Sequence, residues 1–60
     1  MDKQCATAIG RLERYLFRVK KAIRNGELSI ALSDSAELGE IARRLWVHLE
    51  KLINTNSKES

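Results

Sequence analysis

Apolar residues in the first 24 positions recur at alternating steps of four and three, at Cys5, Ile9, Leu12, Leu16, Val19 and Ile23. This heptad spacing is typical of an α-helix that buries one narrow seam against another helix. A second row widens the seam on one side, at Ala8, Tyr15 and Ala22. A wider face favours a helix in a bundle over a strict two-stranded coiled coil. The segment therefore restricts the chain to helical packing.

The breakers in the chain predict two helices. Asp2 suits an N-cap, so the first helix is expected over about 2–24. Asn25-Gly26 follows a basic last turn, which predicts a helix stop and a turn over 25–28. The second helix is expected over about 29–54, capped by Ser29; a shorter alternative starts at Ser33 or Asp34. Residues 55–60 are predicted to form a flexible polar tail outside a single domain over 1–54.

The second helix also carries a heptad, with one row at Ala31, Leu38, Leu45 and Leu52 and the other at Ser35, Ala42 and Leu49. In an antiparallel hairpin with this turn, residues whose numbers add to about 53 lie level. Further apolar residues flank both rows, so the surface is wider than one neighbouring helix can cover. We therefore expect a partner to contact Ile41, Leu45, Trp46, Leu49 and Ile53.

A chain of 60 residues buries little surface alone, and small domains usually gain stability from disulfides, metals or partners. One Cys excludes an intrachain disulfide, which leaves oligomerisation as the expected source of buried area. The predicted fold is all-α: an antiparallel two-helix hairpin that completes a four-helix bundle by dimerising or by packing on another helical protein.

The positive charge is concentrated in the first helix. Residues 1–24 hold seven Lys or Arg and two acids, whereas the whole chain has a net charge of only +3. The basic face includes an aromatic residue and comprises Arg11, Arg14, Phe17, Arg18, Lys21 and Arg24. Basic side chains around an exposed ring suit nucleic acid, by counterion release and base stacking. An acidic protein partner and an ordinary solvated helix face remain alternatives.

Cys5 and His48 are predicted to lie near each other in the hairpin. A Cys–His pair can form a nucleophile, and two pairs from a dimer could form a zinc site. No third orienting group and no Gly-rich loop accompany the pair, so we expect Cys5 to be a small buried hydrophobe and His48 an edge residue. The prediction is no enzyme activity, no catalytic or metal-binding residue, no cofactor and no small-molecule substrate. One unpaired Cys and the absence of a long apolar run favour a cytoplasmic protein without a membrane span.

The chain resembles two families of small helical hairpins. The opening Met1-Asp2-Lys3-Gln4 with Thr7-Ala8-Ile9 is similar to the plasmid RNA-one-modulator (Rop) proteins. Those are homodimeric four-helix bundles that bind paired RNA loops through the first helix. The resemblance implies RNA contacts by Lys3, Arg14, Phe17 and Lys21.

The second resemblance is to the small E-type co-chaperones of type III secretion needle subunits, through Leu12-Glu13, Leu16, Lys20-Lys21 and Gly26. Those hairpins bind a larger helical-repeat chaperone. From the residues themselves, the leading expectation is a non-catalytic interaction module, such as an adaptor, assembly factor or small chaperone. The alternative is a small homodimeric RNA- or DNA-binding regulator that uses the basic face.

Overall fold

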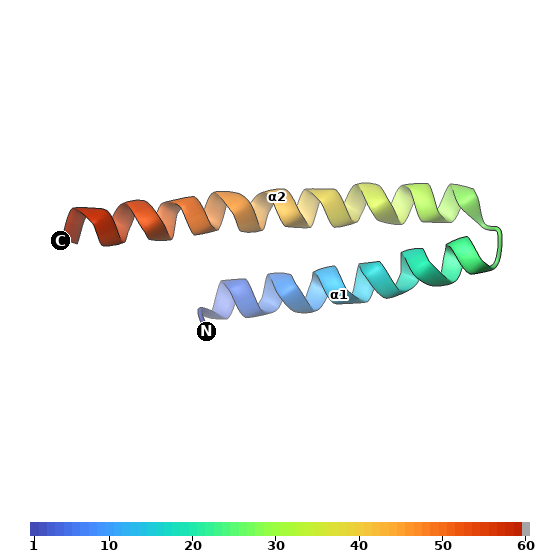
Figure 1. Cartoon of the computed structure of the whole chain (residues 1–60), viewed down its shortest axis with the longest axis horizontal. Helices are drawn as coiled ribbons and strands as arrows, with labels where there is room; N and C mark the ends of the chain where they lie inside the picture. Colours follow the sequence, from blue (N-terminus) through green and yellow to red (C-terminus); the bar gives the residue numbers. More distant parts are fainter. Residues whose placement is uncertain (60) are drawn as a thin grey trace.

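The computed structural model describes residues 1–59, which form two antiparallel α-helices, α1 (Lys3–Arg24) and α2 (Leu28–Glu59) (Figure 1). The helices pack side by side into an elongated hairpin of 51 × 17 × 10 Å. This confirms the predicted all-helical hairpin. Neither helix holds, within the described residues, a stretch long and apolar enough to cross a membrane. The longer α2 projects past the start of α1 (Figure 1).

Both ends of α1 are closed by the residues that the sequence indicated. The carboxylate of Asp2 accepts a hydrogen bond from the Cys5 backbone N–H at 3.1 Å, as an N-cap does. At the other end Gly26 has a φ of +74°, in the left-handed region that favours glycine. Its N–H bonds the Ile23 carbonyl at 3.1 Å, and the Glu27 N–H bonds the Ala22 carbonyl at 2.8 Å. This pair of bonds is the Schellman motif, which ends the helix and reverses the chain.

The bounds of α2 differ from the expected 29–54. The helix begins at Leu28, so Ile30, Ser33 and Asp34 all lie inside it. It continues to Glu59, five residues beyond the expected end, through the segment expected to be a polar tail. Asn, Ser and Thr have modest helix propensity, but no Pro or Gly interrupts residues 54–59. A helix already formed can therefore continue through them.

The two helices meet along a line of residues that we call the hairpin seam. Six come from α1: Cys5, Ala8, Leu12, Tyr15, Val19 and Ala22. Seven come from α2: Ala31, Asp34, Leu38, Ile41, Leu45, His48 and Leu52. All are buried or half-buried, and both sets follow steps of three and four. Ligand atoms of Cys5 and His48 lie within 4.8 Å of each other, which agrees with the prediction that residues whose numbers add to about 53 lie level, called the level rule below.

The seam uses a different row of α1 from the one that the heptad favoured. Cys5, Leu12 and Val19 were placed correctly. The second row is Ala8, Tyr15 and Ala22 rather than the predicted Ile9, Leu16 and Ile23, which are exposed. Both rows flank the same central row, so the spacing within one helix cannot choose between them. Small residues on the chosen side, together with Ala31 on α2, let the helices approach closely at the turn end.

The hairpin has no deep core. In the described part of the chain, the buried apolar residues are Cys5, Ala22, Ala31 and Ile41, and no large side chain is fully enclosed. The accessible surface is 5030 Å², whereas a compact monomer of this mass exposes about 4,000 Å². The radius of gyration of 14.8 Å also exceeds the roughly 10 Å of a compact domain of this length. The hairpin therefore exposes about 1,000 Å² of surface that a globular chain of the same mass would bury.

Ile41 should be the most important apolar side chain for hairpin stability, because it is 4% exposed and lies at the middle of the seam. We expect Ile41→Ala to destabilise the hairpin by about 2–3 kcal/mol, through lost burial and a residual cavity. Ile30→Ala is the matched control, because Ile30 lies on the same helix and is about half exposed. It should cost less than about 1 kcal/mol. Urea unfolding followed by circular dichroism, at one fixed protein concentration, measures both; equal losses would contradict the seam.

Candidate functional site

One side of the hairpin carries a set of exposed large apolar residues, which we call the apolar flank. All of them except Leu28 come directly after a seam residue in the sequence. Because the two helices are antiparallel, these positions lie on the same side of the hairpin. α1 contributes Ile9, Leu16 and Ile23, and α2 contributes Leu28, Leu32, Trp46, Leu49 and Ile53. Trp46 is 59% exposed, an unusual state for the largest apolar side chain in a chain. Exposed apolar residues gathered on one side are common at interaction sites of proteins in general.

The α2 part of this flank is a second heptad. It contains Leu28, Leu32, Ser35, Gly39, Ala42, Trp46, Leu49 and Ile53, separated by steps of four and three. None of the eight residues is charged. Large side chains lie at both ends of the row and small ones in its middle. A Cβ added at Gly39 would meet nothing within 4 Å, so the hairpin itself gives no steric reason for glycine there.

The five residues predicted to contact a partner lie on two different surfaces of the hairpin. Trp46, Leu49 and Ile53 are exposed on the apolar flank. Ile41 and Leu45 instead belong to the hairpin seam, where Ile41 is buried against α1 and Leu45 is half-buried. The contribution of Ile9, Leu16 and Ile23 from α1 was not predicted, because the heptad spacing favoured that row for the seam.

The basic face of α1 lies away from the apolar flank. Its members are all exposed, at Arg11, Arg14, Phe17, Arg18, Lys21 and Arg24. Phe17 is 68% exposed among them. Arg18 is the member with structural contacts, because its guanidinium lies 5.2 Å from the centre of the Tyr15 ring and its Nε lies 3.4 Å from Asp34 Oδ2. The described residues give the other five members no ion pair.

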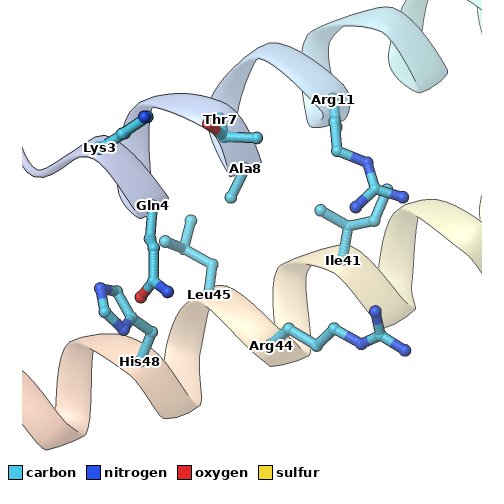
Figure 2. Close-up of a pocket in the computed structure, with 9 residues that line it drawn as sticks. All are labelled: Lys3, Gln4, Thr7, Ala8, Arg11, Ile41, Arg44, Leu45 and His48. Atoms are coloured by element: carbon cyan, nitrogen blue, oxygen red, sulfur yellow. The ribbon is translucent and has the colours of Figure 1, made fainter.

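Part of the basic face borders a groove between the helices near the start of α1 (Figure 2). The groove has a volume of about 460 Å³ and an apolar floor that includes Ala8, Ile41 and Leu45. Lys3 and Arg11 line it from α1, and Arg44 lines it from α2. No acidic residue is among its lining residues. The sequence did not single out Arg44, although the near-equal levels of Arg11 and Arg44 in the hairpin could have indicated this position.

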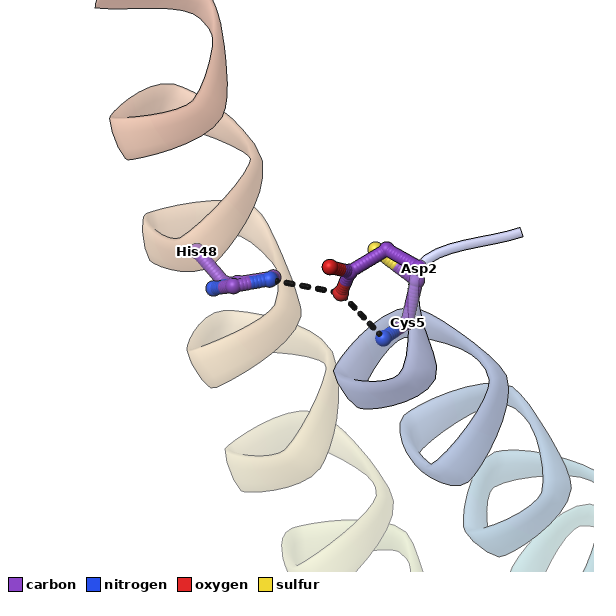
Figure 3. A group of neighbouring side chains, drawn as sticks. All are labelled: Asp2, Cys5 and His48. Carbon is purple, nitrogen blue, oxygen red and sulfur yellow. Dashed lines mark hydrogen bonds and ion pairs between the residues drawn. The ribbon is translucent and has the colours of Figure 1, made fainter. Parts of the chain in front are cut away.

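A cluster of polar side chains closes the open end of the hairpin (Figure 3). His48 Nε2 lies 2.9 Å from Asp2 Oδ2, the same oxygen that accepts the Cys5 backbone N–H. The hydrogen bond with His48, reinforced by the Cys5 N–H, lowers the pKa of Asp2 below its ordinary value. Burial, and then the nearby Asp2 charge, raise the pKa of the Cys5 thiol. A thiol held in its neutral form is a poor nucleophile.

Asp34 is a buried carboxylate within the seam, 6% exposed. Its Oδ2 has no hydrogen bond from the described residues, although Arg18 lies at ion-pair distance on the more exposed side. A buried carboxylate without full hydrogen bonding opposes folding unless a cation compensates it. Arg18 is therefore partly committed to the hairpin and is less available to an external ligand.

No protein-family model, curated protein sequence or solved structure matches this chain.

Substitutions of the two members of the Arg18–Asp34 pair should change stability differently. Asp34→Leu should leave stability unchanged or raise it by up to about 3 kcal/mol, because an apolar side chain replaces a buried charge. Arg18→Ala should lower stability by about 1 kcal/mol, since Arg18 is half exposed and water screens part of the pair.

Arg14→Ala is the control for Arg18, because Arg14 is an exposed Arg of the same helix; it should change stability by less than about 0.5 kcal/mol. In the double variant Arg18→Ala/Asp34→Leu, the loss from Arg18 should disappear. Thermal unfolding at fixed concentration measures the unaltered protein and all four variants. Equal effects of Arg18→Ala and Arg14→Ala would show that the pair does not contribute.

Proposed function

We propose that this protein is a non-catalytic helical interaction module that acts by burying its apolar flank against partner helices, and that the partner is a second copy of the chain. The product is a four-helix bundle of two hairpins. The observation that carries the proposal is the apolar flank itself, which both helices build and which nothing in the hairpin covers.

The uncovered area supports a stable complex. The hairpin exposes about 1,000 Å² more than a compact monomer of its mass. A standard interface buries about 800 Å² on each partner. The excess is therefore of the size that one interface removes. The absence of charged residues from the α2 row also favours a helical, apolar partner over a polar ligand.

The α2 row is complementary to itself in the antiparallel direction. Antiparallel pairing about its midpoint places Leu28 opposite Ile53 and Leu32 opposite Leu49. It also places Trp46 opposite Ser35 and Gly39 opposite Ala42. The largest side chain thus meets a small one, and the two smallest positions face each other where the helices approach most closely. A two-fold dimer needs this property, because the same patch must serve both copies.

The α1 row agrees with this register independently. The level rule of the hairpin, combined with the α2 pairing, places Ile9 opposite Leu16 of the second copy. These are the two residues of the α1 row nearest the two-fold axis, and both are large and apolar. Face-to-face packing of the hairpins in this register joins α1 with α1 and α2 with α2, and gives one apolar layer between them.

Substitution of Gly39 separates dimerisation from hairpin stability. Gly39→Leu raises helix propensity and meets no atom within the hairpin, so helicity should be kept. It should weaken the dimer by about 1–3 kcal/mol, because the close helix contact becomes overpacked. Gly10→Leu is the matched control: it also lies mid-helix in open space, but away from the flank.

Sedimentation equilibrium of the three proteins over a range of concentrations measures the dissociation constants. We expect twice the chain mass for the unaltered protein and Gly10→Leu, and a shift toward monomer for Gly39→Leu. A monomeric mass with full helicity for the unaltered protein would refute the homodimer. Equal dimerisation of Gly39→Leu and Gly10→Leu would refute the register.

A second candidate function is nucleic-acid binding through the basic face, favoured by the exposed Phe17 and by Lys3, Arg11 and Arg44 around one groove. In the proposed dimer this face stays outside the interface and appears twice. The affinity for short RNA or DNA duplexes should then fall steeply with salt. The slope of the logarithm of affinity against the logarithm of salt concentration should fall by about one in Arg11→Ala, as for the loss of one phosphate contact.

Arg43→Ala is the control, because Arg43 is exposed on α2 and does not line the groove. Fluorescence anisotropy at two or more salt concentrations measures the slopes. Absence of binding at low salt would refute the nucleic-acid function and leave the interaction module in place.

A further inference from the structure

The fold brings together three different metal-ligating side chains at the open end of the hairpin. Cys5 and His48 are the single Cys and the single His of the chain, and they lie 43 positions apart in sequence. Asp2 joins them as the N-cap of α1. One ligand atom from each lies within 4.8 Å of the other two (Figure 3). None of the three is a member of the apolar flank, although Asp2 lies seven residues before Ile9, at the end of the same α1 row.

We propose that Asp2, Cys5 and His48 form a three-ligand site for a divalent transition-metal ion of the zinc class. A thiolate, an imidazole and a carboxylate are the three donor types that zinc accepts in proteins. The soft sulfur donor selects against magnesium and calcium, which prefer oxygen ligands alone. Three protein ligands leave the fourth tetrahedral position for water, and the exposed side of Asp2 opens that position to solvent.

The distances fit an ion after small side-chain movements. Metal bonds of about 2.0–2.3 Å place tetrahedral ligand atoms roughly 3.3–3.7 Å apart. The present separations range from 2.9 Å, between Asp2 and His48, up to the 4.8 Å limit. Movements of about 1 Å therefore suffice, within the reach of side-chain rotation. On binding, the ion takes the place of the Asp2–His48 hydrogen bond, and the thiol proton of Cys5 leaves to solvent.

The helix cap and the metal site can share Asp2. Its Oδ2 accepts the Cys5 backbone N–H at 3.1 Å, and no dashed line joins its second oxygen to His48 or to the Cys5 backbone in Figure 3. A hydrogen bond of this kind orients a metal-binding carboxylate. Because the ligands come from α1 and α2, binding would tie the start of α1 to α2. The hairpin should then be stabilised by the metal in proportion to its free concentration.

Cobalt(II) is the spectroscopic probe, used on the full chain without an affinity tag and under reducing conditions. Thiolate ligation gives a sulfur-to-cobalt charge-transfer band, and tetrahedral geometry gives intense visible bands. We expect both bands at one ion per chain, displaced by zinc. Cys5→Ser should abolish the charge-transfer band. His48→Gln and Asp2→Asn should each weaken binding by at least about tenfold.

Asp2→Asn tests the carboxylate without removing the cap, because Asn caps a helix as well as Asp does. Glu13→Gln is the control for an exposed carboxylate of α1 outside the cluster, and it should bind as the unaltered chain does. Circular dichroism checks that every variant keeps its helicity. Zinc should raise the unfolding midpoint of the unaltered chain and of Glu13→Gln, but not of Cys5→Ser. Cobalt binding without the charge-transfer band, or equal affinity across all variants, would overturn the proposal.

Discussion

Close approach between α1 and α2 along the hairpin seam is the contact on which the rest of the molecule depends. At the turn end the seam is formed by Ala22 and Ala31, which allow the backbones to lie near each other. Small residues let the two helices lie close together, but they bury little apolar area. Most of the large apolar side chains therefore remain outside the seam. The same seam thus creates the hairpin and leaves it exposed. A chain of this size is only marginally stable alone, so the free energy of unfolding of the single hairpin is expected to be small.

Polar groups at the two ends of the seam give it direction and register. Asp2 and His48 meet at the open end, and Arg18 and Asp34 meet toward the turn. Neither pair adds much stability where water reaches it. Their value is that a shift of either helix by one residue would separate both pairs and leave Asp34 buried without a cation. Buried polar groups select one alignment in this way in other helical assemblies.

Much of the fold could be predicted from the sequence, because the signals were local. Gly26 after a basic helix end and Asp2 before a heptad have direct physical meaning, and the level rule followed from them. The choice between the Ala8 row and the Ile9 row could not be predicted, since both flank Leu12 and the choice depends on the other helix. The role of Asp2 beside Cys5 and His48 also escaped prediction. The capping function of Asp2 was evident from its position before the heptad. Its contact with His48 was not, because His48 lies 46 positions away in the sequence.

The Schellman turn has a consequence for how the molecule forms. Only three residues, Asn25, Gly26 and Glu27, separate α1 from α2, so closing the hairpin costs little chain entropy. Contacts between nearby helices form quickly, in microseconds to milliseconds for small helical proteins. Association of two hairpins is instead a second-order step whose rate depends on how often copies meet. In the proposed dimer, assembly would follow closure of the hairpin, so Trp46 would stay exposed to water until two copies meet.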